Sequence, residues 1–306
     1  MDKKTERLVN VARMYYEQDR TQSEIADRYG ISRPMVSKLL KEARDRGIVT
    51  IRINAPKGES GGAPSLMELV GRCFGIYDGV AVPGGPNDQT TNEAVAEAAI
   101  SYLSELGGAS LGIGWGHIIG DVVKHMEQKA KLVPIGTFVC PLIGNGGVGL
   151  KNYHSNELVR SIAEHSGAQP RFIYSPACVL SEQELKLTRE LDSYHEIYHV
   201  WEKLDVALVN IGNFPSVPDF ASEARYGDLL IRQKAVGRIL NYFMDSQGHI
   251  IRSDTDYAIQ IPLELLTRTR HVVGICSANT SPKAALKTGY LKHFIAPEHV
   301  VREALE

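Results

Sequence analysis

The chain has 306 residues, of which 43% are hydrophobic and 23% charged, a composition that excludes disorder as the dominant state. No run approaches the roughly 20 consecutive apolar residues of a membrane-spanning helix, and the first residues, MDKKTERLVN, open on charges, so we expect a protein that is neither membrane-spanning nor exported. The net charge of −2 is unevenly distributed along the chain. Residues 1–57 hold 13 Lys and Arg against 8 Asp and Glu, whereas residues 58–306 hold 21 Lys and Arg against 28 Asp and Glu. This distribution predicts that only the first segment meets a polyanion.

Three helices are predicted within the first 45 residues. Apolar residues at helical spacing place the first from about Lys4 to Tyr16. Thr21, followed three residues later by Glu24, is a capping-box sequence that begins the second. Ser32 is a natural N-cap for the third.

The second and third helices have helix-turn-helix spacing. Ala26 is small where two helices must approach, Gly30 permits the positive φ of a tight turn, and Val36 supplies an apolar position six residues later. A plain helical hairpin is the alternative, but capping, turn and core positions all favour the helix-turn-helix. The second helix of such a motif enters the major groove with its N-terminal residues at the base edges.

Polar and basic side chains on the third helix are the candidates for DNA contact. Arg33 and Lys38 suit guanine edges, whereas Lys41 and Arg44 suit phosphates; solvated surface charge is the alternative for any one of them. Alternating apolar residues at 49–54 predict a strand that would serve as a wing. The predicted DNA-binding set is Thr21, Gln22, Ser32, Arg33, Met35, Ser37, Lys38, Lys41, Arg44 and Arg52.

A Pro/Gly/Ser-rich stretch at 55–64 predicts a linker between a DNA-binding domain, residues 1–54, and a second domain, residues 65–306. Short aliphatic runs separated by helical stretches predict a mostly parallel sheet with helices on both faces, a Rossmann-like α/β fold. Glycines cluster where predicted strands end, and ligands bind at these carboxyl ends. The predicted strands are 79–82, 110–115, 136–140, 206–211, 271–277 and 293–296, and the helices include 93–106, 156–165, 282–286 and 298–305.

Three motif matches do not fit their context. Residues 144–149 spell G-x-G-x-x-G, but no helix opens immediately afterwards. Ser110 lies in a G-x-S-x-G, yet it begins a strand instead of ending one. His195 and His199 form an H-E-x-x-H, but the apolar stripe of that helix, Leu191, Tyr194, Tyr198, Trp201 and Leu204, turns both imidazoles toward solvent. We therefore predict no catalytic residue, no metal and no cofactor, and we expect the four cysteines to be reduced, buried thiols.

The chain resembles the SorC/DeoR-type sugar-binding transcriptional regulators over essentially its whole length. The first domain matches through TQSEIADRYGISRPMVSKLLKEARDRGIVTIRI, and the second through LGIGWG, the helix start at 156–159, LVNIG, the Ala-Val-Gly at 235–237 and the Thr-Asp at 255–256. The resemblance implies a winged helix-turn-helix joined to an effector domain similar to the sugar-phosphate isomerase/deaminase fold. Such regulators bind a sugar or sugar phosphate, usually as tetramers or dimers, and this binding changes their affinity for operator DNA.

The resemblance also implies an effector pocket. His117 and Ile118 stand where the family commonly has two threonines, and residues 276–279 replace a usual Gly-Gly turn. Both departures fall where an anion would be held, which favours a non-phosphorylated or otherwise atypical effector. Carried over by position, the pocket residues are Gly114, Gly116, His117, Gly144, Gly146, Gly147, Asn156, Gly212, Asp256 and Lys283.

The sequence thus predicts a cytoplasmic, bacterial-type transcriptional regulator without catalysis. Its expected partners are double-stranded operator DNA, a sugar or sugar-phosphate effector and further copies of itself as a homo-tetramer or dimer, with no membrane. One alternative is a sugar-phosphate isomerase/deaminase-like enzyme carrying a DNA-binding head. The other is a constitutive DNA-binding scaffold, for which no small molecule would shift operator affinity.

Overall fold

A computed structural model describes residues 3–16, 18, 20–45, 64–106, 110–129, 132–147, 149–215 and 225–306. The chain divides into two compact units, residues 1–62 and 63–306. The predicted wing, with Arg52, and the predicted linker up to residue 63 lie outside the described residues. No described helix has the length and apolar character needed to cross a bilayer.

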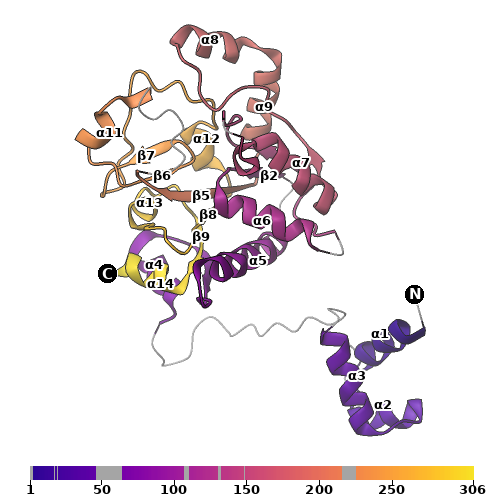
Figure 1. The fold of residues 1–306 in the computed structure, drawn as a ribbon. Helices are drawn as coiled ribbons and strands as arrows, with labels where there is room; N and C mark the ends of the chain where they lie inside the picture. The colour runs from indigo at the N-terminus through magenta and orange to yellow at the C-terminus, as the bar shows by residue number, and fades with distance from the viewer. Residues whose placement is uncertain are drawn as a thin grey trace. The chain divides into compact units, whose positions relative to one another are not determined.

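The described residues of the first unit form three helices, α1 (Lys3–Tyr16), α2 (Gln22–Tyr29) and α3 (Arg33–Asp45), close to the predicted ranges (Figure 1). α3 packs against both α1 and α2. Apolar side chains on the inward faces of all three helices form the core, so that the trihelical bundle is held by tertiary packing as well as by helix propensity. The fully or nearly fully buried members are Leu8, Val11, Ile25, Val36 and Leu40.

The capping box that begins α2 is confirmed. The Thr21 amide donates to Glu24 Oε2 at 2.8 Å, and the Glu24 amide donates to Thr21 Oγ1 at 3.3 Å. The Thr21 amide and the Thr21 hydroxyl, which donates to Glu24 Oε2 at 3.0 Å, both lower the pKa of the Glu24 carboxyl group. At the other end Gly30 has φ +61°, in the left-handed region that glycine enters without strain, and the Ile31 amide donates to Ala26 O at 3.0 Å. Local signals therefore fix both ends of α2.

Replacing Thr21 by alanine should destabilise α2 by about 0.5–2 kcal/mol, since the Glu24 amide loses its side-chain acceptor. Amide hydrogen exchange of the full chain should be faster across residues 21–30 in Thr21→Ala and unchanged in Ser23→Ala, the exposed neighbour. Equal exchange in the two variants would contradict the stabilising role of the cap.

The described part of the second unit forms a nine-stranded sheet in the order β1-β9-β8-β5-β2-β3-β4, all parallel, with an antiparallel hairpin of β6 and β7 attached to β5. The strands are β1 (Asp78–Val82), β2 (Ser110–Ile113), β3 (Phe138–Pro141), β4 (Gln169–Pro170), β5 (Val206–Asn213), β6 (Gly237–Ile239), β7 (Tyr242–Met244), β8 (His271–Ile275) and β9 (His293–Pro297). The predicted strands are confirmed, with β2, β3 and β8 shorter than expected. The short strands β4, β6 and β7 were not predicted.

Helices cover the sheet on both faces, which explains why β2 and β9 are buried at every position. In Figure 1, α5, α6 and α7 lie together on one side of the strands, and α4 and α14 lie together on the other. The helices are α4 (Leu66–Phe74), α5 (Asp88–Leu106), α6 (His117–Glu127), α7 (Ser155–Ser166), α8 (Glu182–Glu190), α9 (Asp192–Glu202), α11 (Leu229–Arg232), α12 (Leu263–Arg268), α13 (Lys283–Lys287) and α14 (Glu298–Leu305), with a 3-10 turn at Lys151–Tyr153.

The strand order reverses between β2 and β5. From β2 the chain proceeds outward to β3 and β4, and it then returns to place β5 on the other side of β2 before continuing to β8 and β9. Connections on either side of such a switch point leave in opposite directions, so a crevice opens beyond the carboxyl ends of the two strands. This crevice is the expected ligand site of the fold.

Two expectations about individual side chains need correction. Leu191 does not share the apolar stripe of α9 and is 52% exposed, because it is the extended N-cap residue and lies outside the helix. Cys140 and Cys276 are buried free thiols, but Cys73 is exposed and Cys178 half-buried. The number and spacing of the cysteines did not indicate how exposed Cys73 and Cys178 would be.

Two histidines pair at the amino ends of β8 and β9. His293 Nε2 lies 2.9 Å from His271 Nδ1, and His293 Nδ1 lies 2.7 Å from the Tyr102 hydroxyl. Burial, followed by the charge on His271, lowers the pKa of His293 to about 4, and burial also lowers the pKa of His271. Lys292 acts in the same direction, and Asp78 opposes it. The folded protein therefore holds a neutral pair here.

This pair should make the domain less stable in mild acid. An unfolded histidine titrates near pH 6.5, so between about pH 6.5 and 4 the unfolded chain binds more protons than the folded one, and stability falls as the pH is lowered through this window. Urea unfolding at pH 7.5 and 5.0 should show a smaller loss for His293→Gln than for the wild type. An identical loss would contradict the assignment.

Candidate DNA-binding and effector sites

The outer face of α3 carries the predicted DNA-reading residues. Val36 and Leu40 are buried beneath it. Because a helix repeats every 3.6 residues, the side chains on the opposite side of the helix from these two core residues turn outward as one surface. The predicted side chains Ser32, Arg33, Met35, Ser37, Lys38 and Lys41 are all exposed, and the side chain of Arg44 lies outside the described residues.

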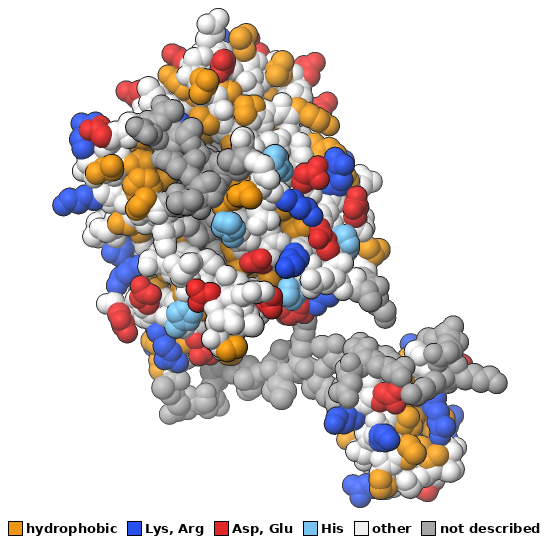
Figure 2. All heavy atoms as spheres, in the orientation of Figure 1, with side chains coloured by type: hydrophobic (Ala, Val, Ile, Leu, Met, Phe, Trp, Pro, Cys, Tyr) orange, Lys and Arg blue, Asp and Glu red, His pale blue; other side chains and the backbone are white. Residues whose placement is uncertain are grey.

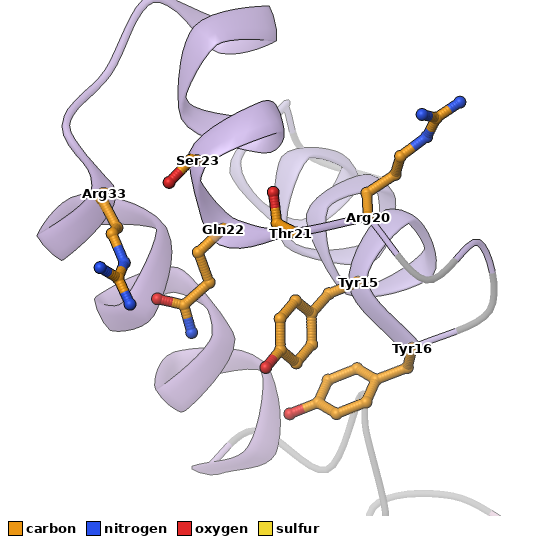
Figure 3. Close-up of a pocket in the computed structure, with 7 residues that line it drawn as sticks. All are labelled: Tyr15, Tyr16, Arg20, Thr21, Gln22, Ser23 and Arg33. Atoms are coloured by element: carbon orange, nitrogen blue, oxygen red, sulfur yellow. The ribbon is translucent and has the colours of Figure 1, made fainter.

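A concave surface, which encloses a pocket with a volume of about 740 Å³, adjoins this face (Figure 3). It lies where the end of α1 meets the starts of α2 and α3, and Gln22 points between Arg33 and Tyr15 in the view, while Arg20 points away from the others. Two arginines, hydroxyl groups and the amino end of a helix are groups that contact DNA phosphates. The residues lining it are Tyr15, Tyr16, Arg20, Thr21, Gln22, Ser23 and Arg33.

Four of these seven, Tyr15, Tyr16, Arg20 and Ser23, were missed by the sequence analysis. Tyr15 is one of the apolar residues at helical spacing near the end of α1, and it is half-buried with its ring edge-on to Tyr16 at a centroid distance of 4.9 Å. Arg20 immediately precedes the capping box, and this adjacency was the available signal.

The glycines that end β2 lie at the switch point. The Gly114 amide donates to Leu208 O at 2.8 Å, and the Gly116 amide donates to Asn152 O at 2.9 Å. Gly116 has φ +116°, and a Cβ atom on it would lie 2.9 Å from Asn210 Nδ2. These glycines therefore provide room for a neighbouring side chain, and their amides are already engaged within the protein.

The glycine loop after β3 is held in the same way. The Gly144 amide donates to Ile259 O at 2.9 Å, and the Gly146 amide donates to Tyr153 O at 2.8 Å. Asn156 joins the start of α7 to Ile173: its side-chain amide nitrogen donates to Ile173 O, and its side-chain oxygen accepts from the Ile173 amide. Gly147 is exposed, with open space around it.

Tyr153 connects this loop to the switch point. Its ring lies edge-on to His117, at a centroid distance of 5.6 Å, and to Trp115, at 5.8 Å. A Cβ atom on Gly146 would lie 2.9 Å from the Tyr153 carbonyl oxygen and 3.1 Å from both Trp115 Cζ3 and Tyr153 Cβ. Two of the predicted residues, His117 and Gly146, thus lie against the side chain of Tyr153, which the sequence patterns did not indicate.

Asp256 has structural partners. Its Oδ1 atom is ion-paired with Arg225, which is 2% exposed, and its Oδ2 atom accepts a hydrogen bond from the Tyr226 hydroxyl at 2.6 Å. It lines a different depression from His117, together with Arg189 and Arg252. The predicted Asp256 therefore tethers residues 225–226, and its two oxygens are occupied.

Lys283 begins α13, next to the end of β5. The loop before it is pinned by Asn213, whose Nδ2 donates to Asn279 O at 2.9 Å and whose Oδ1 accepts from the Ser281 amide at 2.9 Å. α13 also packs on β6. Lys283 and Gly212 are thus brought to the same edge of the sheet.

A polar depression of about 600 Å³ opens beside His117. Figure 2 shows acidic, basic and histidine side chains mixed on this face, over α5 and α6. Burial raises the pKa of Asp121, so this carboxyl group is less acidic than usual. Side chains that donate hydrogen bonds and side chains that accept them both line the depression, and together they suit a polyhydroxylated molecule. The lining residues are Gln89, Asn92, Glu93, His117, Asp121, Lys124, His125, Gln128, Ser277 and Asn279.

Across the described ranges, no three His, Cys, Asp or Glu side chains group as metal ligands.

Comparison with known proteins gives two family matches. Residues 63–306 match the family described as "Putative sugar-binding domain", and residues 5–46 match "Sigma-70, region 4". The chain is 31% identical to the sorbitol operon regulator of Klebsiella pneumoniae, over 88% of this chain and 86% of that protein. It is 27% identical to the deoxyribonucleoside regulator of Bacillus subtilis, over 99% of this chain and 98% of that protein.

A solved structure agrees with these matches. The full-length sorbitol operon regulator SorC from Klebsiella pneumoniae superposes with a TM-score of 0.73 at 27% identity, and the comparison covers 100% of both chains. The helix-turn-helix, the parallel sheet and the match across the sugar-binding unit agree with one assignment. This chain belongs to the SorC/DeoR-type family of sugar-binding transcriptional regulators.

Proposed function

We propose that this regulator binds operator DNA through α3 and that a sugar or sugar-derived effector, bound beyond the carboxyl ends of β2 and β5, controls that binding. The observation that carries the proposal is the convergence of Gly114, Gly116, His117 and Gly212 at the switch point of a sugar-binding unit that is joined in one chain to a helix-turn-helix. An effector acts by binding two arrangements of the protein with different affinities.

The DNA-contact surface comprises the exposed face of α3 and the concave surface around Gln22. Arg33 and Lys38 read base edges, while Lys41, Arg20 and the amino end of α2 hold phosphates. The Klebsiella relative is named for an operon that it regulates, and the Bacillus relative for deoxyribonucleosides. We infer that the present chain likewise controls genes for a small carbohydrate or a derivative of one.

The functional unit is a cytoplasmic homo-oligomer, a dimer or tetramer. Two recognition helices related by a twofold axis meet half-sites about one helical turn apart, or a multiple of it, so the operator is palindromic. The effector domain binds its ligand and does not convert it. Sedimentation of the protein with and without operator DNA tests the assembly.

Gel shifts on the DNA upstream of the protein's own gene, with sugars, sugar acids and sugar phosphates added singly, test the function. At least one compound should change the operator affinity and be recovered unchanged. Binding that no compound alters would favour a constitutive scaffold. Conversion of the compound by the full chain would favour a sugar-phosphate isomerase or deaminase.

A further inference from the structure

The two histidines of the H-E-x-x-H sequence lie on α9, four residues apart. Side chains at this spacing lie one above the other along a helix, so His195 and His199 share one face. Tyr194, Ile197 and Trp201 are buried on the opposite face, whereas both histidines are exposed. α9 therefore presents two imidazole rings to solvent, on two successive turns.

The ring of His199 is held as a metal ligand would be. Its Nδ1 atom lies 2.8 Å from Glu202 Oε2, and its side chain is 71% exposed. An ionised carboxylate only accepts hydrogen bonds, so Nδ1 carries the proton and Nε2 keeps its lone pair. Metal-bound histidines generally donate their other ring N–H to a carboxylate, which fixes the tautomer and makes the ligand more basic. His199 Nε2 is thus a donor atom that an ion in solution can reach.

The charge of the helix favours a cation. The acidic residues of α9 are Asp192, Glu196 and Glu202, all exposed, and its sequence contains no Lys or Arg. Asp192 precedes His195 by three residues and Glu202 follows His199 by three, so a carboxylate lies at each end of the imidazole pair on the same face. A surface of one sign raises the local concentration of ions of the other sign.

We propose that His195 and His199 bind one divalent transition-metal ion through their Nε2 atoms. Two histidines at this spacing on a helix can hold one ion, and imidazole suits Zn²⁺, Ni²⁺ and Cu²⁺, whereas Mg²⁺ and Ca²⁺ prefer oxygen ligands. No third His, Cys, Asp or Glu side chain joins the pair within the part of the chain that the structure describes, so water fills the remaining positions. A site with two protein ligands differs from the three-ligand centre of a zinc protease.

The metal site is independent of the effector crevice. α9 ends at Glu202 and β5 begins at Val206, so the last turn of α9 lies near the amino end of that strand, whereas the crevice lies beyond its carboxyl end. An ion held by both histidines links two turns of α9 and stabilises the helix, because it binds only the folded form of the pair. Metal binding therefore leaves a signature in α9 itself.

Calorimetric titration of the tag-free full chain with NiSO₄ tests the site. Loss of a hydrogen-bonded partner behind a ligand costs about 10- to 100-fold in metal affinity, so removal of a ligand itself should cost at least about tenfold. His195→Gln and His199→Gln should each show this loss, and Glu202→Ala should show a smaller one. MgCl₂ should give the same result with the wild type and with the three variants. All three side chains are exposed, so circular dichroism should show each variant folded.

His249→Gln is the matched control. His249 is exposed and its Nδ1 atom lies 3.1 Å from Asp245 Oδ2, as in the contact of His199, but the sequence has no other histidine within four residues of it. This variant should bind Ni²⁺ as the wild type does. Ni²⁺ should also slow amide hydrogen exchange across residues 192–202 of the wild type and not of His195→Gln. Equal nickel affinity of the wild type and both α9 histidine variants, or an equal loss in His249→Gln, would overturn the inference.

Discussion

Operator affinity should fall steeply when Arg33 and Lys38 are both replaced by alanine. Both side chains are exposed on α3 above the buried Val36 and Leu40, so their removal leaves the trihelical core unchanged. A side chain that reads a base edge contributes about 1–3 kcal/mol, which is about 5- to 150-fold in affinity for each contact. A gel-shift titration at fixed salt measures the loss.

The control is Arg28→Ala, which removes one positive charge from the exposed surface of α2. It should lower affinity only through the general electrostatic contribution, and equally for operator and unrelated DNA. If the double variant also lost affinity equally for both DNAs, Arg33 and Lys38 would contact phosphates and another part of the protein would read the sequence.

The helix-turn-helix was predictable because its signals are local. Thr21, Glu24, Gly30 and Val36 act within one or two turns of their own position, and the structure confirms the helix starts and the left-handed turn that they indicate. The long parallel strands were also predictable, since burial on both faces demands continuous apolar runs. Strands of two or three residues, such as β6 (Gly237–Ile239), carry no such run and were missed.

The effector crevice was only partly predictable, because its chemistry depends on contacts between distant segments. The glycine clusters do lie at the carboxyl ends of β2 and β3, and their place in an effector site stays a prediction. Their amides, however, donate to Leu208, Asn152, Ile259 and Tyr153, residues that no local pattern connects to them. The place of Arg238 opposite Gly212 could not be predicted either, because it arises from the pairing of β6 with β5.

A Gly144→Ala substitution should destabilise the effector domain instead of selectively abolishing ligand binding. The added Cβ atom would lie 2.2 Å from the Pro176 oxygen, 2.5 Å from the Pro176 carbonyl carbon and 2.8 Å from the Ala177 nitrogen. All three are backbone atoms, and the Ala177 amide is itself tied to Asn145 O at 2.8 Å, so the strain cannot be relieved by a side-chain rotation. Overpacking of this kind costs about 1–3 kcal/mol.

Gly147→Ala is the matched control, because a Cβ atom there meets nothing within 4 Å. Urea unfolding should show a lower midpoint for Gly144→Ala and a change within about 0.5 kcal/mol for Gly147→Ala. Since the Gly144 amide already donates to Ile259, the alanine variant that remains folded should bind the effector with nearly wild-type affinity. Lost binding at unchanged stability would instead mean that Gly144 contacts the ligand directly and that its backbone can accommodate a methyl group. The two measurements together therefore separate a glycine that shapes the loop from one that binds the effector.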